Sequence, residues 1–297
     1  MGEIGVVKVF PKAFVLLEVD QDGFPPTFAV AQKLDSGHVH RPILFRDRQY
    51  TLSRNSHCAA DAILCAGSKR GGALILTRID HVTIGVADLR SGIDAYTRIG
   101  FDVDDSGVAR NEGDHLQLVA APREGLQAIA LASDDLAADS AAVRARHGIA
   151  YITLVAPNVQ PASRHPNGVQ RIERVYIAVK DVAAAAAHYA RVLGVPAPKM
   201  ERGTVINADM AIFQLGATAL GLAQPAGPGV AADALERRGP GPFQILYRTS
   251  SMDACAKWMT DHGLPPPARG VRNTGEQAML VMPEHACGVT IGFVGPA

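Results

Sequence analysis

The chain has 297 residues, of which 47% are apolar and 20% are charged, and its 29 basic residues balance its 29 acidic ones. A nucleic-acid-binding protein needs a basic excess to neutralise phosphates, so the zero net charge argues against one. The apolar content argues against a disordered chain. The length allows roughly two domains of about 150 residues each.

The cysteines and the N-terminal residues indicate where the protein works. Four cysteines, none of them in a CxxC pair, predict neither a disulfide framework nor a zinc ribbon, and they fit a reducing compartment. Glu3, Glu18 and Asp20 interrupt the N-terminal apolar runs, so no signal peptide is expected. No segment approaches the ~20 apolar residues that span a bilayer. We therefore expect a cytoplasmic protein without a membrane partner.

Residues 1–75 lack the pattern that organises the rest of the chain. A strand is predicted from Lys8 to Asp20, and the Asp22-Gly23 and Pro25-Pro26 pairs that follow are turn signals. From His38 to Gly72 neither strand alternation nor helical periodicity is sustained, over a length that is uncommon inside a compact domain. The sequence predicts an N-terminal extension that is irregular or poorly ordered.

From residue 78 onward the chain repeats one plan four times. Each unit has an alternating strand, an Asp- or Ser-rich helix start, an amphipathic helix and a glycine stop. Further short strands follow each helix, which predicts βαβββ units. The second unit is truncated, because only one credible strand, Tyr151 to Ala156, lies between Gly148 and Arg164. The units open at Arg78, Gly125, Arg171 and Gly241.

The segments RIDHVTIGVADL…AYTRIGF and RIERVYIAVKDV…HYARVLGV carry a family resemblance. With the repeated plan, they resemble the vicinal oxygen chelate (VOC) superfamily, which includes glyoxalase I, bleomycin-resistance proteins, methylmalonyl-CoA epimerase and extradiol dioxygenases. The third and fourth units look closest to the epimerase and glyoxalase pattern. The resemblance implies an α+β fold in which four βαβββ modules, one of them truncated, pair into two open curved-sheet cups.

The domain boundaries follow from the repeat. We expect an N-terminal extension over residues 1–75 and a first glyoxalase-like half over residues 76–160, with the truncated second module. A linker covers residues 161–170. The second glyoxalase-like domain covers residues 171–297.

In this superfamily a divalent metal sits on the floor shared by two modules, held by the first and last strands of each. In the first half, the resemblance places these positions at His81, Gln117 and Gln127, and no last-strand ligand can be placed in the truncated module. One histidine and two glutamines make a weak, degenerate metal site. The alternative is a metal-free cup in which His81 is polar lining.

In the second half, the same four positions hold Arg174, Gly221, Gln244 and Gly292. The arginine would repel a metal and the glycines supply no side-chain oxygen, so neither a metal nor another cofactor is expected in the second domain. The two glycines would instead leave space for a ligand on the floor of the cup.

Successive side chains of a strand point to opposite faces of the sheet. This alternation predicts that four polar side chains of the second half face its cup, namely Arg174, Tyr176, Gln244 and Arg248. Two arginines with a tyrosine and a glutamine suit a planar anion such as a carboxylate. We therefore predict a binding site for a small, anionic organic molecule. In the alternative, the arginines pair with acidic neighbours such as Glu173 or reach solvent.

Two functions remain open. The first is isomerase- or lyase-type chemistry on a carbonyl substrate, which needs a Lewis acid or oxyanion donors and a base. Only His81 is available for either role, so no catalytic residues are assigned. The alternative is a non-catalytic, ligand-sequestering protein of the bleomycin-resistance kind, which needs shape and hydrogen bonds alone. The expected partners are a small-molecule ligand and a second copy of the chain in a homodimer. Strands of that second copy, or alternatively residues 8–30 of the same chain, would complete the first cup.

Overall fold

The computed structural model describes the backbone of four strands between residues 4 and 50, and residues 76–158 and 161–296 in full. The chain divides into two units, Met1–Gly71 and Gly72–Ala297. Among the residues described, no helix has the length and apolar character needed to cross a membrane.

The N-terminal unit contains two antiparallel hairpins. Strand β1 (Ile4–Phe10) pairs with β2 (Ala13–Glu18), and β3 (Ile43–Phe45) pairs with β4 (Arg48–Tyr50). The prediction of one strand from residue 8 to residue 20 is therefore wrong, because Phe10 is already the partner of Ala13. The second hairpin lies in the stretch that showed no periodicity, since strands of three residues are too short for alternation to be seen.

A five-stranded sheet holds the first two repeats, in the order β6-β7-β5-β8-β9. The second repeat keeps only its first and last strands, and the first repeat is itself one strand short of the βαβββ plan. The elements are β5 (Leu76–Val86), α1 (Leu89–Ile99), β6 (Val108–Arg110), β7 (His115–Ala120), β8 (Gly125–Ser133), α2 (Leu136–Ala145) and β9 (Ile152–Val155).

An eight-stranded sheet holds the last two repeats, both complete, in the order β11-β12-β13-β10-β14-β17-β16-β15. Its strands are β10 (Val169–Ala178), β11 (Lys199–Gly203), β12 (Ala208–Leu215), β13 (Thr218–Pro225), β14 (Gly241–Thr249), β15 (Ala268–Val271), β16 (Gln277–Val281) and β17 (Thr290–Val294). Its helices are α3 (Val182–Leu193), α4 (Val230–Arg238), α5 (Met252–Asp261) and a short 3-10 turn (Pro283–His285). The predicted α+β class with two curved sheets is confirmed.

The repeat helices begin and end at the residues that the sequence marked. Asp88, Asp181 and Ser251 each accept a hydrogen bond from the backbone N–H three residues further on, at the starts of α1, α3 and α5. Helices α1 and α3 end at Gly100 and Gly194, whose φ angles of 102° and 58° lie in the left-handed region that favours glycine. Helix α4 belongs to no repeat and follows a glycine without a side-chain cap.

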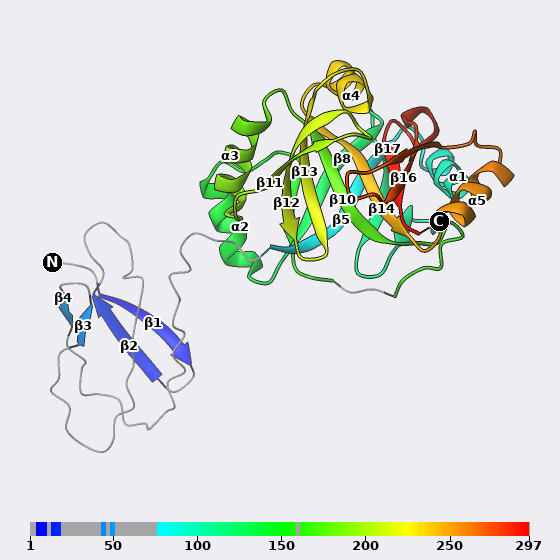
Figure 1. The fold of residues 1–297 in the computed structure, drawn as a ribbon. Coiled ribbons are helices and arrows are strands. Elements are labelled where there is room, and N and C mark those ends of the chain that lie inside the picture. Colours follow the sequence, from blue (N-terminus) through cyan, green and yellow to red (C-terminus); the bar gives the residue numbers. More distant parts are fainter. Residues whose placement is uncertain are drawn as a thin grey trace. The chain divides into compact units, whose positions relative to one another are not determined.

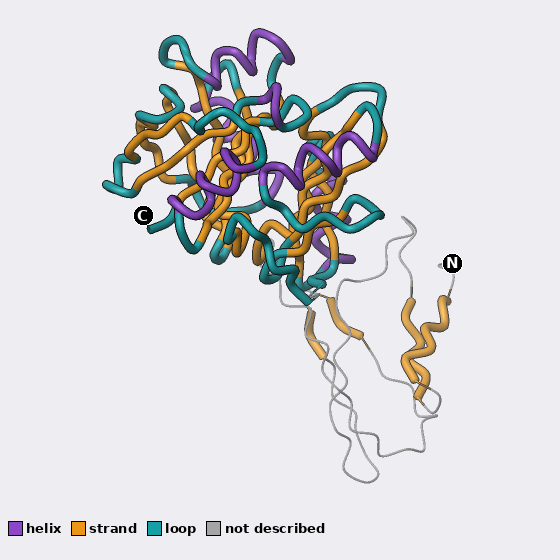
Figure 2. The backbone as a smooth tube through the Cα atoms, turned by 90° about the vertical axis from the view of Figure 1, so that its right-hand side faces the viewer, coloured by secondary structure: helices purple, strands orange, loops and turns teal. Residues whose placement is uncertain are grey.

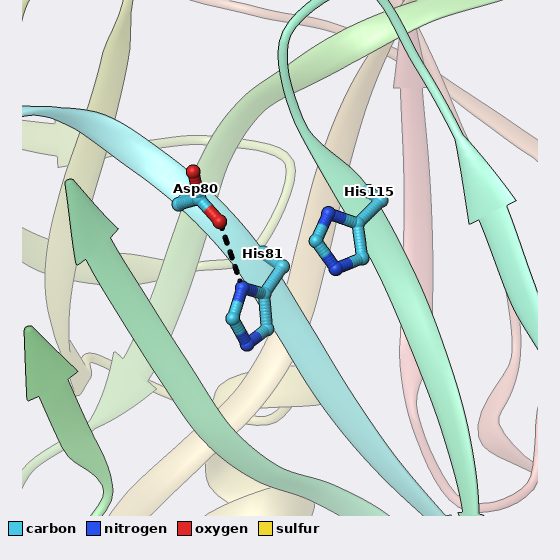
Figure 3. A group of neighbouring side chains, drawn as sticks. All are labelled: Asp80, His81 and His115. Atoms are coloured by element: carbon cyan, nitrogen blue, oxygen red, sulfur yellow. Dashed lines mark hydrogen bonds and ion pairs between the residues drawn. The ribbon is translucent and has the colours of Figure 1, made fainter. Parts of the chain in front are cut away.

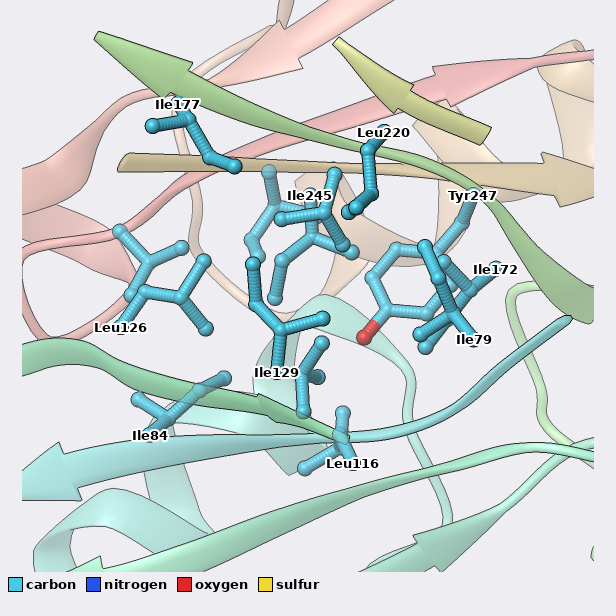
Figure 4. Packing of buried hydrophobic residues seen from close by; sticks show 14 of the residues in the cluster. Ile79, Ile84, Leu116, Leu126, Ile129, Ile172, Ile177, Leu220, Ile245 and Tyr247 are labelled. Carbon is cyan, nitrogen blue, oxygen red and sulfur yellow. The ribbon is translucent and has the colours of Figure 1, made fainter. Parts of the chain in front are cut away.

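The two sheets pack face to face, with α1 and α5 at one side and α2 and α3 at the other (Figure 1). Figure 2 shows the same arrangement after a quarter turn, with the strands of both sheets in the middle. Isoleucines and leucines of β5, β7 and β8 meet those of β10, β13 and β14 across this interface, together with Tyr247 (Figure 4). The two halves therefore share one hydrophobic core.

The segment between the halves, predicted as a linker, is packed into this core. His165 and Asn167 are buried. One ring nitrogen of His165 accepts from the backbone N–H of Asp102 at 3.0 Å, and the other donates to Oδ1 of Asn111 at 2.8 Å. Asn167 donates to the carbonyl of Ile99 at 3.2 Å. The connection is thus a structural part of both halves.

Strands β5 and β10 carry a β-bulge at the same place in the repeat. The pairing shifts between Ile79 and His81 in β5, and between Ile172 and Arg174 in β10. The extra residue is acidic in each case, Asp80 in one strand and Glu173 in the other. A bulge turns two successive side chains toward the same side of a sheet. It therefore places each acidic residue beside the side chain that follows it, on the face away from the shared core.

Candidate functional site

The first candidate site lies on the outer face of the five-stranded sheet. Oδ1 of Asp80 lies 2.9 Å from Nδ1 of His81. His115 is directly opposite His81 in the parallel register of β5 and β7. The two imidazole rings stack, with centroids 4.5 Å apart and planes 21° apart (Figure 3). One side-chain oxygen or nitrogen from each of the three residues lies within 4.8 Å of the others.

The charge states of this group follow from its surroundings. Burial alone would raise the pKa of Asp80, but the hydrogen bond and the charge of His81 bring it below its ordinary value. Burial lowers the pKa of His115 to about 4, with a further contribution from the charge of His81. At neutral pH the group therefore contains a carboxylate beside at least one neutral imidazole.

The predicted metal trio of His81, Gln117 and Gln127 is not brought together. Gln117 is opposite Thr83, two residues along from His81. Gln127 donates from Nε2 to the carbonyl oxygen of Arg123 at 2.7 Å. That amide lies beside the position of Gly85, four residues or about 13 Å along β5 from His81.

Gln127 was also assigned to the wrong position of the repeat. In the eight-stranded sheet, Gln244 is opposite Tyr176, and in the five-stranded sheet the corresponding pair is Ala128 with Thr83. Ala128, not Gln127, therefore corresponds to Gln244, and Gln127 is the unpaired residue at the register shift that follows. Gln127 instead lines a cavity of about 170 Å³ at the starts of β8 and β14, together with Arg123, Leu126, Tyr151, Ala234, Arg238 and residues 239–243.

The second candidate site is the cup of the eight-stranded sheet, where Arg174 and Tyr176 lie together. Nη1 of Arg174 donates to the hydroxyl of Tyr176 at 3.2 Å and to Oε1 of Glu201 at 3.3 Å. Its guanidinium carbon lies 5.5 Å from the centre of the Tyr176 ring. Glu201 also pairs with Lys199 at 3.1 Å. Two cations thus share one carboxylate, which leaves this corner of the cup with one positive charge.

The other predicted arginine, Arg248, belongs to a ring of four charges at one end of the cup. Arg248 bonds Glu173 and, at 2.8 Å, Glu276. Arg272 bonds the same two carboxylates at 2.7 Å each. Burial would lower the pKa of both arginines, but the two glutamates raise it. The ring as a whole is neutral, and both predicted arginines, Arg174 with Glu201 and Arg248 here, pair with acidic neighbours as in the alternative stated above.

The opposite end of the cup is apolar and is covered by α4. Ala231 and Ala234 of this helix are buried in one cluster with Tyr176, Phe243 and Leu246. The glycines on the floor do not leave open space there. A Cβ at Gly221 would lie 2.7 Å from a ring carbon of Tyr176, and a Cβ at Gly292 would lie 2.7 Å from Cδ1 of Leu246. The space predicted for a ligand at these glycines is filled by the protein's own side chains.

Two polar atoms between these ends have no partner among the described residues. They are Nε of Arg174 and Oε1 of Gln244, and both are buried. Gln244 is only 1% exposed, and it is opposite Tyr176 across β10 and β14. Buried polar atoms in folded proteins nearly always have a partner, which is often water or a ligand. An unpaired donor and an unpaired acceptor thus flank Tyr176.

The divalent metal of the superfamily does not fit this cup. The four corresponding positions offer a guanidinium, an amide and two glycines, and the guanidinium is held by Glu201. A metal prefers carboxylate, imidazole or thiolate ligands. We therefore derive no chemical step through a metal at these positions.

The comparisons with known proteins agree with this architecture. Residues 173–281 match the family described as Glyoxalase/Bleomycin resistance protein/Dioxygenase superfamily. A triple mutant of 4-hydroxymandelate synthase from Streptomyces coelicolor is similar in structure, with a TM-score of 0.56. The match has 14% sequence identity and covers 75% of this chain and 93% of that one, which shows a common fold. Methylmalonyl-CoA epimerase from Mycobacterium tuberculosis matches at 26% identity over 44% of this chain and 90% of that one, with a TM-score of 0.39. No protein with curated annotation matches the chain.

Proposed function

We propose that the chain binds a small anionic organic molecule in the cup of its eight-stranded sheet, the part of the chain that matches the Glyoxalase/Bleomycin resistance protein/Dioxygenase superfamily over residues 173–281. The observation that carries the proposal is the pair of buried, unpaired atoms, Nε of Arg174 and Oε1 of Gln244. Leaving such groups unpaired costs about 1–3 kcal/mol each, which a ligand with matching groups would recover.

The two atoms define what such a ligand carries. Nε of Arg174 is a donor beside a local surplus of one positive charge, so it favours a carboxylate oxygen. Oε1 of Gln244 is an acceptor, so it favours a hydroxyl or N–H group on the same molecule. A hydroxy or amido carboxylic acid combines these features.

The charge ring favours binding over chemistry. A general base must be free to take a proton from the substrate. Glu173 and Glu276 are each held by two arginines. Burial would raise the pKa of Glu276, but the two arginines hold it below its usual value, which makes it a poor base. These contacts support the ligand-sequestering function over the isomerase or lyase one.

Calorimetric titration of the full chain with a panel of small hydroxy and amido carboxylic acids tests the proposal. For the best binder, Arg174→Met and Gln244→Leu are each expected to weaken binding at least tenfold, because each removes one hydrogen bond to a charged or buried group. The methyl ester of that acid should bind correspondingly more weakly to the wild-type protein.

Arg202→Met is the matched control. Arg202 lies on the edge strand β11 of the same sheet, is half exposed and pairs with Asp209 at 2.9 Å, so its loss should leave the affinity unchanged. Failure of every acid in the panel to bind, or equal affinities for wild type, Arg174→Met and Gln244→Leu, would contradict the proposal.

A further inference from the structure

The group of Asp80, His81 and His115 on the five-stranded sheet has no role in the proposed cup site. We propose that these three side chains bind one divalent transition-metal ion. The site differs from the one that the superfamily resemblance implied, because it shares only His81 with those positions and takes its other ligands from the bulge residue Asp80 and from His115, which precedes Gln117 by two residues on β7. It also stands independently of ligand binding in the eight-stranded sheet.

The distances are close to those of a metal site. Zinc–nitrogen and zinc–oxygen bonds of about 2.0–2.2 Å place neighbouring ligand atoms about 3.0–3.4 Å apart. Oδ1 of Asp80 and Nδ1 of His81 are 2.9 Å apart, so a metal replaces the proton that they share. One ring nitrogen of His115 lies within 4.8 Å of a ligand atom of each of the other two residues. A movement of its side chain by about 1.5 Å completes a face of three ligands.

The sheet holds these ligands in place. The bulge in β5 turns Asp80 toward His81, and the parallel register holds His115 beside them (Figure 3). Asp80 is 3% exposed, and its second oxygen lies 3.5 Å from Nη2 of Arg78. Arg78 is itself fixed by the carbonyls of Gly113 and Asn158. Such contacts orient a carboxylate ligand and leave its other oxygen for the metal.

The charges and ligand types select the class of ion. Two imidazoles and one carboxylate suit Zn²⁺, Ni²⁺ or Co²⁺ better than Mg²⁺ or Ca²⁺, which prefer all-oxygen sites. Arg110 is opposite His115 across β6 and β7, and its charge opposes that of a cation at His115. It pairs with Asp104 at 2.6 Å, which offsets its repulsion. With three protein ligands, the remaining coordination positions stay open to water or to a further ligand.

The eight-stranded sheet supplies an internal comparison. At the equivalent bulge it carries Glu173 and Arg174, with Ala219 opposite Arg174 in the same parallel register. The repeat therefore has the same backbone geometry with and without metal-ligating side chains. The site depends on the identities of His81 and His115.

Titration of the full chain with Zn²⁺ or Ni²⁺, followed by calorimetry, and with Co²⁺, followed by its visible absorption, tests the site. We expect one ion per chain at this site, with affinity reduced at least tenfold by His81→Ala, by His115→Ala and by Asp80→Asn. Bound Zn²⁺ should also raise the melting temperature of the wild type and not that of the histidine variants.

His188→Ala is the control, because His188 is exposed on α3, where its Nδ1 lies 3.1 Å from Nη2 of Arg191; this variant should bind as the wild type does. Histidines elsewhere, such as those at positions 38, 40 and 57, add the same background to every variant. His115→Asn serves if His115→Ala fails to fold, as judged by near-ultraviolet circular dichroism. Equal affinities of wild type, His81→Ala and a folded His115 variant would overturn the proposal, as would the absence of binding to the wild type.

Discussion

Raising the pH from 4 to 8 is expected to lower the free energy of unfolding of the wild-type protein by about 4 kcal/mol relative to an Asp114→Asn variant. Asp114 is 6% exposed. It accepts hydrogen bonds from the side-chain amide of Asn111 and from the backbone N–H of Ile172, which is 2.9 Å away. The residue thus connects the first half of the chain to strand β10 of the second.

The direction of this pH dependence follows from the burial of Asp114. Burial raises the pKa of Asp114 from 3.8 to about 7, and the two donors only partly oppose this. The unfolded chain loses the proton near pH 4, whereas the folded protein keeps it until about pH 7. Folding is therefore most favoured by this residue below pH 4, and the contribution is lost as the pH rises through 7.

The comparison with Asp114→Asn is needed because His115 and His165 change the stability with pH in the opposite direction. Burial lowers the pKa of both histidines, so they destabilise the fold as the pH falls below about 6.5. Both are present in wild type and variant. Urea unfolding of the two proteins at several pH values gives the difference directly. A difference that stays constant between pH 4 and pH 8 would show that Asp114 is ionised in the fold throughout this range.

Replacing Tyr247 by phenylalanine is expected to stabilise the protein by about 1–2 kcal/mol, whereas the same change at Tyr96 should destabilise it by about 1 kcal/mol. Both tyrosines are fully buried. The hydroxyl of Tyr96 donates to the carbonyl of Ala286 at 3.3 Å. The hydroxyl of Tyr247 has no partner among the described residues, and it lies in the core between the sheets (Figure 4).

The two variants form a matched pair, since each removes one oxygen atom from a buried ring. Their expected effects differ only because one oxygen is paired and the other is not. In chemical denaturation, we expect the unfolding midpoint to rise for Tyr247→Phe and to fall for Tyr96→Phe. A loss of stability in Tyr247→Phe equal to that in Tyr96→Phe would mean that a buried water satisfies the Tyr247 hydroxyl.

The repeated strands and helices could be predicted from the sequence because local signals mark them. Asp88, Asp181 and Ser251 start helices as expected, and Gly100 and Gly194 end them. Helix α4 carried no such signal, since it follows a glycine without a side-chain cap. The first repeat has one strand fewer than the βαβββ plan, and this was not predicted either. A missing strand leaves only an irregular stretch of sequence.

The candidate site was harder to predict, for a reason that lies in the backbone. Strict alternation places Asp80 and His81 on opposite faces of a strand, so their adjacency in sequence carried no signal. A bulge reverses this, and a bulge depends on the pairing of two strands that are distant in the chain. The position of Gln127 was misassigned by one residue for the same reason. Arg174 and Tyr176 lie together in the cup and Gln244 is opposite Tyr176, while their role in binding stays a prediction. Glu173, named from the sequence as an acidic neighbour of the arginines, pairs with Arg248.

The shared core and the buried connection also determine how the polypeptide tolerates being cut. Residues 156–158 are exposed, so a protease can reach the chain there without first opening the core. The isoleucines that face each other across the sheets would still hold the two fragments together after the cut (Figure 4). We expect the nicked protein to elute from gel filtration as one particle, and each fragment made alone to aggregate through the surface that its counterpart normally covers. The two repeat pairs are therefore one folding unit, in spite of their separate sheets.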